Sequence, residues 1–555
     1  MRGRADALAA IAAERFDVLV IGGGITGAGV ALDAASRGYS VALVERAEYA
    51  SGTSSRSSKL VHGGLRYLQN LDLGLVREAL LERRLMVRLA PHLVRPLPMI
   101  VPAFAGAHPD RLVGIGLNMY DVMSVPLRGR RRGRIAQLDQ SEAAWSPDRH
   151  RMISGDEVSA LLPALAAREP TGGYLFYDCQ TDDARLVLTV LSEAERFGAI
   201  CANRARVTGL RAGRGGATVV SVHDGCGGDR LEVQADNVIN ATGVWADRIA
   251  PGELHSEAEL PQIVPSRGTH VLLSQARLPL CAGAIVPVAD GRSIFALPWL
   301  GRSLVGTTDE TYEGAIEHVQ PSERDVEYLL GAVNEFFGGS LGRDDLVGAY
   351  AGVRPLISSG DSRRSVDISR REELFETSSG MITITGGKLT TWRRMAKLAV
   401  DRLVARDGRQ APCRTEEIPL GAPADPEHLP RVPGVAEEAY ASLAGRYGFA
   451  ARQVLELAAA DPSLARPIVA GQPDLLAEAR FAAAAEQASS VGDVLLRRTR
   501  LGLLAARECC GDGGEVARRV AATVGAALGW DVATVAAEAA AFADEARAEG
   551  IVVTG

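Results

Sequence analysis

The stretch FDVLVIGGGITGAGVALDAASRGYSVALVE, residues 16–45, predicts a strand, a glycine turn, a helix and a second strand. Residues 16–21 are almost entirely apolar, as in a parallel strand that is buried on both faces. A helix is expected over residues 25–37, where small side chains recur. The second strand covers residues 41–44 and ends at Glu45. The stretch therefore predicts an α/β fold that contains a parallel sheet.

The glycine turn GGGITG lies between the first strand and the helix, where a dinucleotide fingerprint is expected. Gly22 permits the tight turn, Gly24 lets the backbone approach a pyrophosphate, and Gly27 lets the helix and strand pack closely. The free N–H groups at the helix start, residues 25–26, favour an anion there. The carboxylate of Glu45 can accept hydrogen bonds from ribose hydroxyls. These features predict a Rossmann-like dinucleotide-binding domain.

Two later strand ends favour FAD over NAD, although an NAD enzyme could carry the same fingerprint. Residues 237–243, NVINATG, predict a strand that ends in glycine, and so do residues 383–388, TITGGK. Three strand ends that are far apart in sequence can converge on one long, extended ligand. FAD is such a ligand.

Length and composition limit the possible classes of protein. The chain has 555 residues, which predicts two or three domains. Its formal net charge is −7, so it lacks the basic bias of a nucleic-acid binder, and no nucleic-acid partner is expected. Its seven cysteines form no CxxC pair, which argues against a zinc ribbon or a disulfide framework and suits a reducing cytoplasm. No metal site is expected.

Membrane contact, if any, is expected to be peripheral. No window of about 18 apolar residues exists, so no transmembrane helix is predicted. Residues 1–16 predict a short helix rather than a signal peptide. The basic cluster RGRRRGR, residues 128–134, is either a solvated loop or a contact with anionic lipid.

The remaining chain divides into a strand-rich part and a helical part. Residues 269–274, 293–299 and 303–309 alternate as strands of an antiparallel sheet do. Prolines within residues 412–430 predict a linker. From about Ala436 the sequence is rich in Ala, Leu, Glu and Arg with helical periodicity, which predicts an all-α domain.

Residues 52–67, GTSSRSSKLVHGGLRY, resemble the signature of FAD-dependent glycerol-3-phosphate dehydrogenases. Several other segments resemble this family in the same order and spacing: DAASRG (33–38), YDCQTDDARLV (177–187), GTTD (306–309), AGVRPL (351–356) and GGKLTTWRRMA (386–396). Trp392 stands where the family commonly has tyrosine. The resemblance covers nearly the whole chain.

The resemblance implies a Rossmann-like FAD-binding domain, an antiparallel-sheet substrate domain of the D-amino-acid-oxidase type, and an all-helical C-terminal domain. The segments expected for these domains are, in that order, residues 16–90, 181–260 and 365–408; residues 91–180 and 261–364; and residues 412–545.

The resemblance also implies a reaction and its partners. The expected reaction is oxidation of sn-glycerol 3-phosphate to dihydroxyacetone phosphate by hydride transfer to FAD, with electrons then passed to a quinone. The expected location is the cytoplasm, in peripheral contact with the anionic inner face of the cell membrane. A homodimer is a further possibility.

Site residues are carried over from the matching motifs. Arginines suit a phosphate dianion because the planar guanidinium binds two oxygens at once. The expected substrate contacts are Arg66, Tyr67, Arg354 and Arg370, with Arg371 as the alternative to Arg370. The expected catalytic groups are Arg354, Lys388 and a histidine base, either His270 or His62. The expected cofactor contacts are Gly22, Gly24, Ile25, Thr26, Gly27, Glu45, Thr53, Ser54, Ser58, Lys59, Leu60, Val207, Ala241, Thr242, Gly243, Gly387, Lys388 and Leu389.

Three other functions remain open at the level of sequence. An α-glycerophosphate oxidase would use the same site but reduce oxygen to hydrogen peroxide. An amine or hydroxy-acid oxidase of the same fold would have no use for a cluster of phosphate-binding arginines. A non-catalytic flavin-binding regulator would bind FAD that glycerol 3-phosphate does not reduce.

Overall fold

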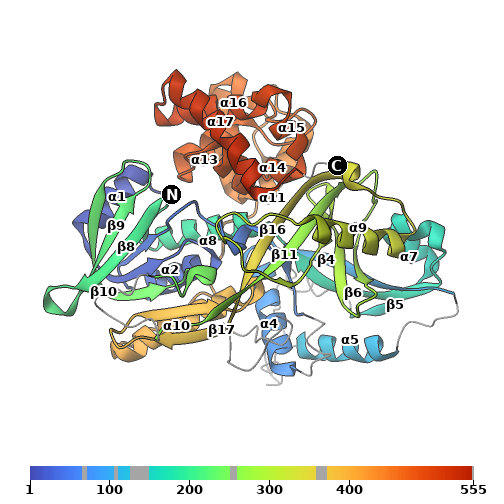
Figure 1. The fold of residues 1–555 in the computed structure, drawn as a ribbon, viewed down its shortest axis with the longest axis horizontal. Helices are drawn as coiled ribbons and strands as arrows, with labels where there is room; N and C mark the ends of the chain where they lie inside the picture. Colours follow the sequence, from blue (N-terminus) through green and yellow to red (C-terminus); the bar gives the residue numbers. More distant parts are fainter. Residues whose placement is uncertain (65–71, 106–110, 125–148, 250–258, 358–371, 553–555) are drawn as a thin grey trace.

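The computed structural model describes residues 1–64, 72–105, 111–124, 149–249, 259–357 and 372–552. Figure 1 shows three parts: an α/β part on the left, a strand-rich part on the right, and a helical part above both. Among the described residues no helix is both long and apolar enough to cross a membrane.

The α/β part is built on one mostly parallel sheet. Its core order is β18-β10-β1-β2-β7, with all neighbours parallel. These strands are β1 (Arg15–Ile21), β2 (Val41–Val44), β7 (Ile200–Ala202), β10 (Arg230–Asn240) and β18 (Ile382–Gly386). Antiparallel strand β17 (Glu372–Glu376) adds to one edge, and β8 (Ala205–Ala212) and β9 (Thr218–Asp224) extend from β10. The predicted strand–helix–strand unit is therefore present.

Helices cover the parallel sheet because its strands are apolar on both faces. Helix α2 (Ile25–Ser36) contacts α8 (Asp183–Arg196) and α10 (Trp392–Arg406), and their apolar side chains form one core cluster. Helix α1 (Arg4–Ala13) packs with residues of β8, β9 and β10 in a separate cluster. Helices thus pack against the sheet in two separate clusters, and the glycine turn lies at one end of this sheet.

The strand-rich part has a second, mixed sheet of order β15-β11-β14-β13-β12-β4-β6-β3, in which β16 also pairs with β11 and β5 with β6. Its strands are β3 (Leu60–Val61), β4 (Arg95–Ala103), β5 (Arg151–Ser154), β6 (Gly172–Gln180), β11 (Ile263–Ser274), β12 (Gly283–Pro287), β13 (Ser293–Trp299), β14 (Arg302–Gly306), β15 (Glu310–Thr311) and β16 (Leu346–Ile357). Helices α7 (Gly155–Leu161) and α9 (Glu323–Phe337) pack on it. Helices α4 (Leu73–Leu89) and α5 (Arg111–Ser124) lie below it in Figure 1.

The C-terminal part is helical, as predicted. Its helices are α11 (Glu437–Tyr447), α12 (Ala451–Ala460), α13 (Leu476–Ala485), α14 (Leu501–Leu504), α15 (Ala506–Cys510), α16 (Glu515–Leu528) and α17 (Val532–Glu549). Helices α14 and α15 contact β16, so this part rests on the second sheet.

The two sheets draw their strands from the segments expected for the two domains, with one exception. Strand β3 belongs to the segment expected in the FAD-binding domain, residues 16–90, but pairs with β6 of the second sheet. The chain therefore crosses between the sheets within the signature, residues 52–67. The domain boundaries themselves stay a prediction.

Candidate active site

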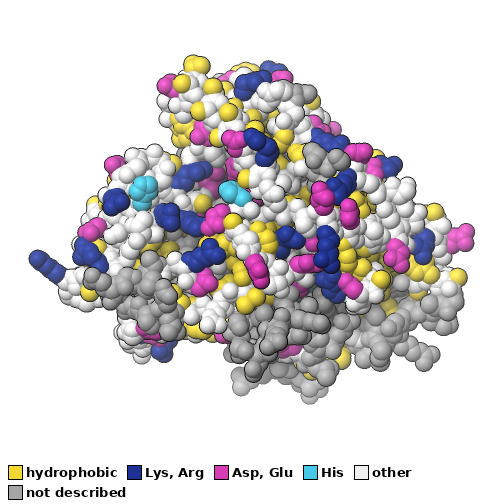
Figure 2. Space-filling view, in the orientation of Figure 1, with side chains coloured by type: hydrophobic (Ala, Val, Ile, Leu, Met, Phe, Trp, Pro, Cys, Tyr) yellow, Lys and Arg dark blue, Asp and Glu magenta, His cyan; other side chains and the backbone are white. Residues whose placement is uncertain are grey.

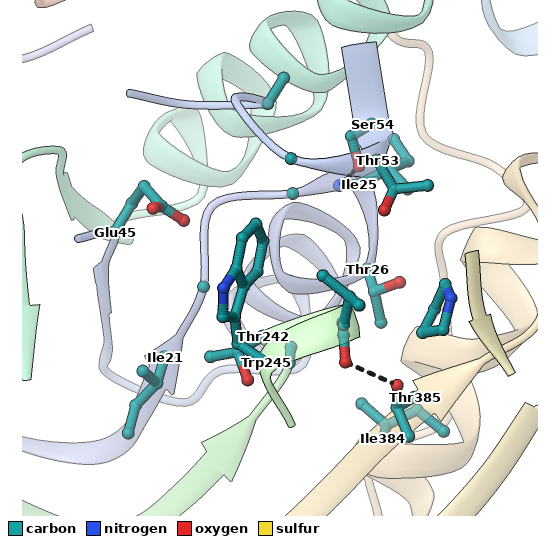
Figure 3. Close-up of a pocket in the computed structure, with 18 of the residues that line it drawn as sticks. Ile21, Ile25, Thr26, Glu45, Thr53, Ser54, Thr242, Trp245, Ile384 and Thr385 are labelled. Carbon is teal, nitrogen blue, oxygen red and sulfur yellow. Dashed lines mark hydrogen bonds between the residues drawn. The ribbon is translucent and has the colours of Figure 1, made fainter. Parts of the chain in front are cut away.

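Two cavities meet at the carboxyl ends of the parallel strands. The first, which we name the strand-end cavity, has a volume of about 250 Å³ and is lined from the ends of β1, β2, β10 and β18 (Figure 3). The second, which we name the adjoining cavity, has a volume of about 740 Å³ and lies against β11, β13 and β16. Thr53, Ser57, Pro355 and residues 387–389 line both. A long ligand could therefore pass from one cavity into the other.

The predicted cofactor residues converge on the strand-end cavity from stretches that are far apart in the sequence. It is lined by Gly22, Gly24, Ile25, Thr26, Glu45, Thr53, Ser54, Val207, Ala241, Thr242, Gly243, Gly387, Lys388 and Leu389. Two further predicted residues, Ser58 and Leu60, line the adjoining cavity instead. The convergence inferred from three separate strand ends is present.

The glycines of the turn act as the fingerprint predicts. Gly22 has a φ of +114°, and a Cβ there would lie 2.6 Å from the carbonyl oxygen of Ala241. A Cβ on Gly27 would lie 1.9 Å from the carbonyl oxygen of Gly22. Gly27 is therefore a packing residue and does not line the cavity. At Gly24 the helix begins, and the N–H of Ile25 donates to the Ser54 hydroxyl at 3.0 Å.

Glu45 lies at the end of β2, as predicted, and its carboxylate is already held by the backbone. Its Oε2 accepts from the N–H of Gly23 at 2.7 Å, and its Oε1 accepts from the N–H of Ala47 at 2.9 Å. Burial raises the pKa of Glu45, and these hydrogen bonds oppose the rise. Each oxygen keeps a further lone pair with which it can accept from a ligand hydroxyl.

His270 is the better placed of the two predicted histidine bases. It lies on β11, lines the adjoining cavity, and is 2% exposed. Its Nε2 is 2.9 Å from the Ser58 hydroxyl, and its ring stacks on Tyr350 with centroids 4.8 Å apart. Burial, with the nearby charges of Lys59 and Arg354, lowers the pKa of His270 well below its ordinary value. The imidazole is therefore neutral at pH 7 and able to accept a proton.

Arg354 presents a fixed cation to the same cavity. It lies on β16, and its Nη2 donates to the Thr307 hydroxyl at 3.0 Å and to the Thr308 carbonyl at 3.1 Å. Asp309 Oδ1 is 3.4 Å from its Nη1. The side chain is still 26% exposed, so the guanidinium is oriented but not enclosed.

Lys388 and His62 lie near the junction of the cavities. Lys388 follows β18 and lines both cavities. His62 follows β3 and lines the adjoining cavity, with its ring edge-to-face on Phe295. Thr390 holds the backbone of His62 by accepting from its N–H and donating to its carbonyl, both at 3.1 Å.

One predicted cofactor residue has its side chain elsewhere, and three predicted residues are not described. The Lys59 ammonium is fully buried in an ion pair with Asp183, so a contact between Lys59 and the cofactor would have to be made by its backbone, and it stays a prediction. Arg66, Tyr67 and Arg370 lie outside the described residues, as does Arg371. Their roles stay predictions.

Sequence reasoning missed several residues of the two cavities. The indole ring of Trp245 projects into the strand-end cavity (Figure 3), and the Arg46 guanidinium lies 4.3 Å from its centre. Thr307 and Asp309 line the adjoining cavity and orient Arg354. Thr307 and Asp309 belong to the motif GTTD, which was recognised without a role for each residue, and Trp245 lies two residues after the stretch NVINATG.

The residues present fit an FAD molecule. The turn at Gly22 and Gly24 lacks side chains, so a pyrophosphate could approach its backbone, and Glu45 lies where a ribose would follow. Gly387 and Lys388 line both cavities, and the candidate base His270 lines the adjoining one.

Comparison with known proteins agrees with this arrangement. Residues 17–402 match the family described as FAD dependent oxidoreductase, and residues 383–535 match the C-terminal domain of alpha-glycerophosphate oxidase. The chain is 38% identical to glycerol-3-phosphate dehydrogenase 2 of Mycobacterium tuberculosis, covering 98% of this chain and 90% of the relative. It is 33% identical to the aerobic glycerol-3-phosphate dehydrogenase of Bacillus subtilis, covering 88% and 87%.

Solved structures show the same fold. The glycerol-3-phosphate dehydrogenase of Bacillus halodurans, solved in complex with FAD, superposes with a TM-score of 0.77 at 26% identity, covering 100% of this chain and 98% of that one. The L-alpha-glycerophosphate oxidase of Mycoplasma pneumoniae, at 18% identity and a TM-score of 0.53, covers 70% of this chain and 95% of that one and shares the fold. The chain thus belongs to the FAD-dependent glycerol-3-phosphate dehydrogenase family, and FAD is its cofactor.

Proposed function

We propose that the protein oxidises sn-glycerol 3-phosphate to dihydroxyacetone phosphate and passes the electrons from FAD to a quinone. The observation that carries the reaction is the junction of the two cavities. The adjoining cavity, which begins at this junction, is lined by the neutral imidazole of His270 and the oriented guanidinium of Arg354. A secondary alcohol that carries a phosphate needs these two groups.

The phosphate is bound by cations. Arg354 is the described candidate, and Arg66 and Arg370 are the further expected contacts. Each charge-assisted hydrogen bond contributes about 1.5–3 kcal/mol, so two of them would favour the phosphate ester over glycerol by roughly two to four decades. Thr307 and Asp309 keep the Arg354 fork in one orientation, which reduces the entropy lost on binding.

The hydroxyl proton passes to the pair formed by Ser58 and His270. Both line the adjoining cavity and are 2.9 Å apart, and the ring is neutral at pH 7. Bound FAD supplies the acceptor for the hydride that leaves the carbon. The ammonium of Lys388, where the cavities meet, would stabilise the negative charge that develops on the reduced ring.

An anaerobic titration tests the reaction. Purified yellow protein mixed with glycerol 3-phosphate should lose its flavin absorbance near 450 nm, while glycerol at the same concentration should leave it unchanged. Persistence of the absorbance would identify a flavin-binding regulator. Bleaching by sarcosine or 2-hydroxyglutarate, with none by glycerol 3-phosphate, would identify an amine or hydroxy-acid oxidase.

The electron acceptor needs a separate experiment, because the site serves a dehydrogenase and an oxidase equally well. The adjoining cavity is larger than a three-carbon phosphate ester needs, and its lining includes the apolar rings of Phe104 and Phe336, which would suit a quinone ring. The reduced enzyme should be reoxidised rapidly by a soluble quinone and slowly by air. Stoichiometric hydrogen peroxide during aerobic turnover would establish the oxidase instead.

Peripheral membrane contact is proposed through the basic segment, residues 128–134, which lies outside the described residues. On the described part of the face in Figure 2, basic and acidic side chains are interspersed and no broad basic stripe is visible. Replacing the arginines of this segment by glutamine should move the enzyme from the membrane fraction to the supernatant. An unchanged distribution between the membrane fraction and the supernatant would remove this segment's proposed role.

The homodimer is a separate proposal, and sedimentation of the purified protein tests it.

A further inference from the structure

A buried carboxylate joins the signature loop to the helical C-terminal part. Asp183, the first residue of α8, is fully buried, and so are the two cations that contact it. The Lys59 ammonium lies 2.9 and 2.8 Å from its two oxygens, and Arg500 Nη2 donates to its Oδ1 at 3.0 Å. Burial acts to raise the pKa of Asp183, but the charges of Lys59 and Arg500 outweigh it, and the pKa lies below its ordinary value. The carboxylate is therefore charged.

Arg500 reaches this carboxylate from the C-terminal part. Its backbone is left-handed, with a φ of 67°, directly before α14. Its Nη1 donates to the carbonyl of Leu496 at 2.8 Å, within the C-terminal part. Its Nη2 donates at 2.8 Å to the carbonyl of Ser55, in the signature loop. The planar guanidinium thus spans from one part of the chain to the other, which a single ammonium could not do.

The same carboxylate fixes the turn formed by residues 55–59. Its Oδ2 accepts from the N–H of Ser57 at 3.1 Å and from the Ser57 hydroxyl at 2.7 Å. The Lys59 ammonium donates back to the Ser55 carbonyl at 2.6 Å, which closes the turn. Lys59 has a φ of 61°, a conformation that a non-glycine residue keeps only where its surroundings hold it.

This turn contacts His270 on two sides. Ser58, within the turn, is 2.9 Å from His270 Nε2. The Ser57 carbonyl accepts from the Tyr350 hydroxyl at 2.7 Å, and the Tyr350 ring stacks on the imidazole. A shift of the turn would therefore move both the hydrogen-bond partner and the stacking partner of the ring.

Burying a carboxylate together with two basic side chains is a costly way merely to hold two parts of a chain together. The desolvation cost of such a cluster offsets much of its Coulombic gain, and an apolar contact of the same volume is often as stable. What the cluster provides is a fixed geometry, because Lys59 and Arg500 both donate to the Ser55 carbonyl and to the Asp183 carboxylate. We propose that Arg500 is a positioning residue for the oxidation: with Asp183 it sets the turn of residues 55–59, and through Ser58 and Tyr350 it sets the ring of His270. The proposal rests on the proposed function, in which His270 accepts the substrate's proton.

The test compares two arginines that link the C-terminal part to the rest of the chain. Arg500→Gln removes the cation at the turn. Arg204→Gln is the matched control, because the Arg204 side chain bonds to Ser490 and Asp493 of the C-terminal part, away from residues 55–59. Both variants should retain FAD and melt at lower temperature than the wild type. Arg500→Lys keeps the charge without the planar fork and should fall between Arg500→Gln and the wild type.

Two measurements separate positioning from general destabilisation. The first is the rate of flavin reduction by glycerol 3-phosphate in anaerobic stopped flow. It should fall by about ten- to a hundredfold in Arg500→Gln, with a smaller change in substrate affinity, and stay near the wild-type value in Arg204→Gln. The second is hydrogen–deuterium exchange of residues 53–62, which should quicken in Arg500→Gln alone.

Several outcomes overturn the proposal. One is a wild-type reduction rate in Arg500→Gln, and another is an equal loss of rate in Arg204→Gln. If Arg500→Gln does not fold, Ser57→Ala replaces it, since it removes one donor to the same carboxylate. An unchanged rate and unchanged exchange in Ser57→Ala then overturn the proposal. If the wild type itself is not reduced, the proposed function fails, while the exchange of residues 53–62 still decides whether Arg500 fixes the turn.

Discussion

The two cavities are built in different ways. The strand-end cavity is made largely of backbone: glycine turns and strand ends, each marked by a short motif of its own, shape it. The adjoining cavity is made of side chains that come from strands far apart in the chain and are held by further side chains behind them. Local sequence can specify the first kind of site. The second kind depends on the tertiary fold.

The difference predicts different responses to mutation. A change in the strand-end cavity should abolish cofactor binding outright, because a backbone turn has no way to adjust. A change in the adjoining cavity should leave FAD bound and alter rate, affinity or pH dependence by degrees.

The largest effect is expected from Gly27→Ala. The new Cβ would lie 1.9 Å from the carbonyl oxygen of Gly22, so helix and turn must separate. We expect a loss of about 3 kcal/mol or more in the free energy of unfolding, and protein purified without flavin. Absorbance at 450 nm per polypeptide measures this. Gly74→Ala is the control, since a Cβ there meets open space, and it should be neutral. Full flavin content in Gly27→Ala would contradict the account of the turn.

Only part of the strand-end cavity could be predicted from the sequence. The roles of Gly22 and Gly27 followed from the fingerprint, because a short turn between a strand and a helix has few solutions. Trp245 could not be inferred in the same way, since its ring enters the cavity only because β10 lies beside β1 in the folded sheet. The partner of the Lys59 side chain could not be inferred for the same reason. Its acceptor, Asp183, is 124 residues away in the sequence.

The next largest effect is expected from His270→Gln. Loss of a general base should lower kcat by about 10²–10⁴-fold while FAD stays bound. The pKa of His270 in the folded protein lies well below 6.5, so the ring is neutral at pH 7 and is protonated only as the pH falls well below that value. The acid limb of kcat/KM should therefore lie below pH 6.5 in the wild type and disappear in the variant. His428→Gln, at an exposed ring, is the control. A limb at or above 6.5 that vanishes in His270→Gln would show that the ring is not desolvated as described.

A smaller effect on binding is expected from Arg354→Gln. Losing one charge-assisted contact of about 1.5–3 kcal/mol should raise the KM for glycerol 3-phosphate by roughly ten- to a hundredfold, with flavin content unchanged. Steady-state kinetics against substrate concentration measure this. Arg277→Gln, which breaks an exposed pair with Asp345, should change nothing measurable. An unchanged KM would assign the phosphate to other cations.

In the adjoining cavity, the sequence identified single residues but not the contacts that hold them. The motif AGVRPL identified Arg354, but nothing in it indicated that Thr307 and Asp309 would orient the guanidinium, because they lie on a different segment. The sequence favoured His270 over His62 but could not settle which of them is the base. The ranking depends on the stacking of Tyr350 and the hydroxyl of Ser58, which are brought together by pairing between β11 and β16 and by the turn of residues 55–59.

The smallest effect is expected from Glu549, near the end of the chain, because this residue supports the adjoining cavity only through Arg56. Arg56 lines the adjoining cavity, and its Nη2 donates at 2.6 Å to Glu549, the last residue of α17, which also contacts His318 at 2.9 Å. Burial acts to raise the pKa of Glu549, but Arg56 and His318 lower it to about 2. Because this is below the ordinary value of 4.5, the stabilisation is fully present above about pH 4.5 and is lost as the pH falls toward 2.

Glu549→Gln should therefore lower the free energy of unfolding at pH 7 by about 2 kcal/mol, and the gap to the wild type should narrow as the pH falls below 4.5. It should also raise the KM for glycerol 3-phosphate by about threefold, or ~0.6 kcal/mol, because Arg56 loses its anchor, while flavin content stays full. Urea titrations at several pH values and steady-state kinetics measure both. The exposed Glu437→Gln, at a surface pair with Arg431, should change neither. Loss of flavin in Glu549→Gln would contradict the proposed difference between the two cavities, since it would show that the strand-end cavity also depends on remote side chains.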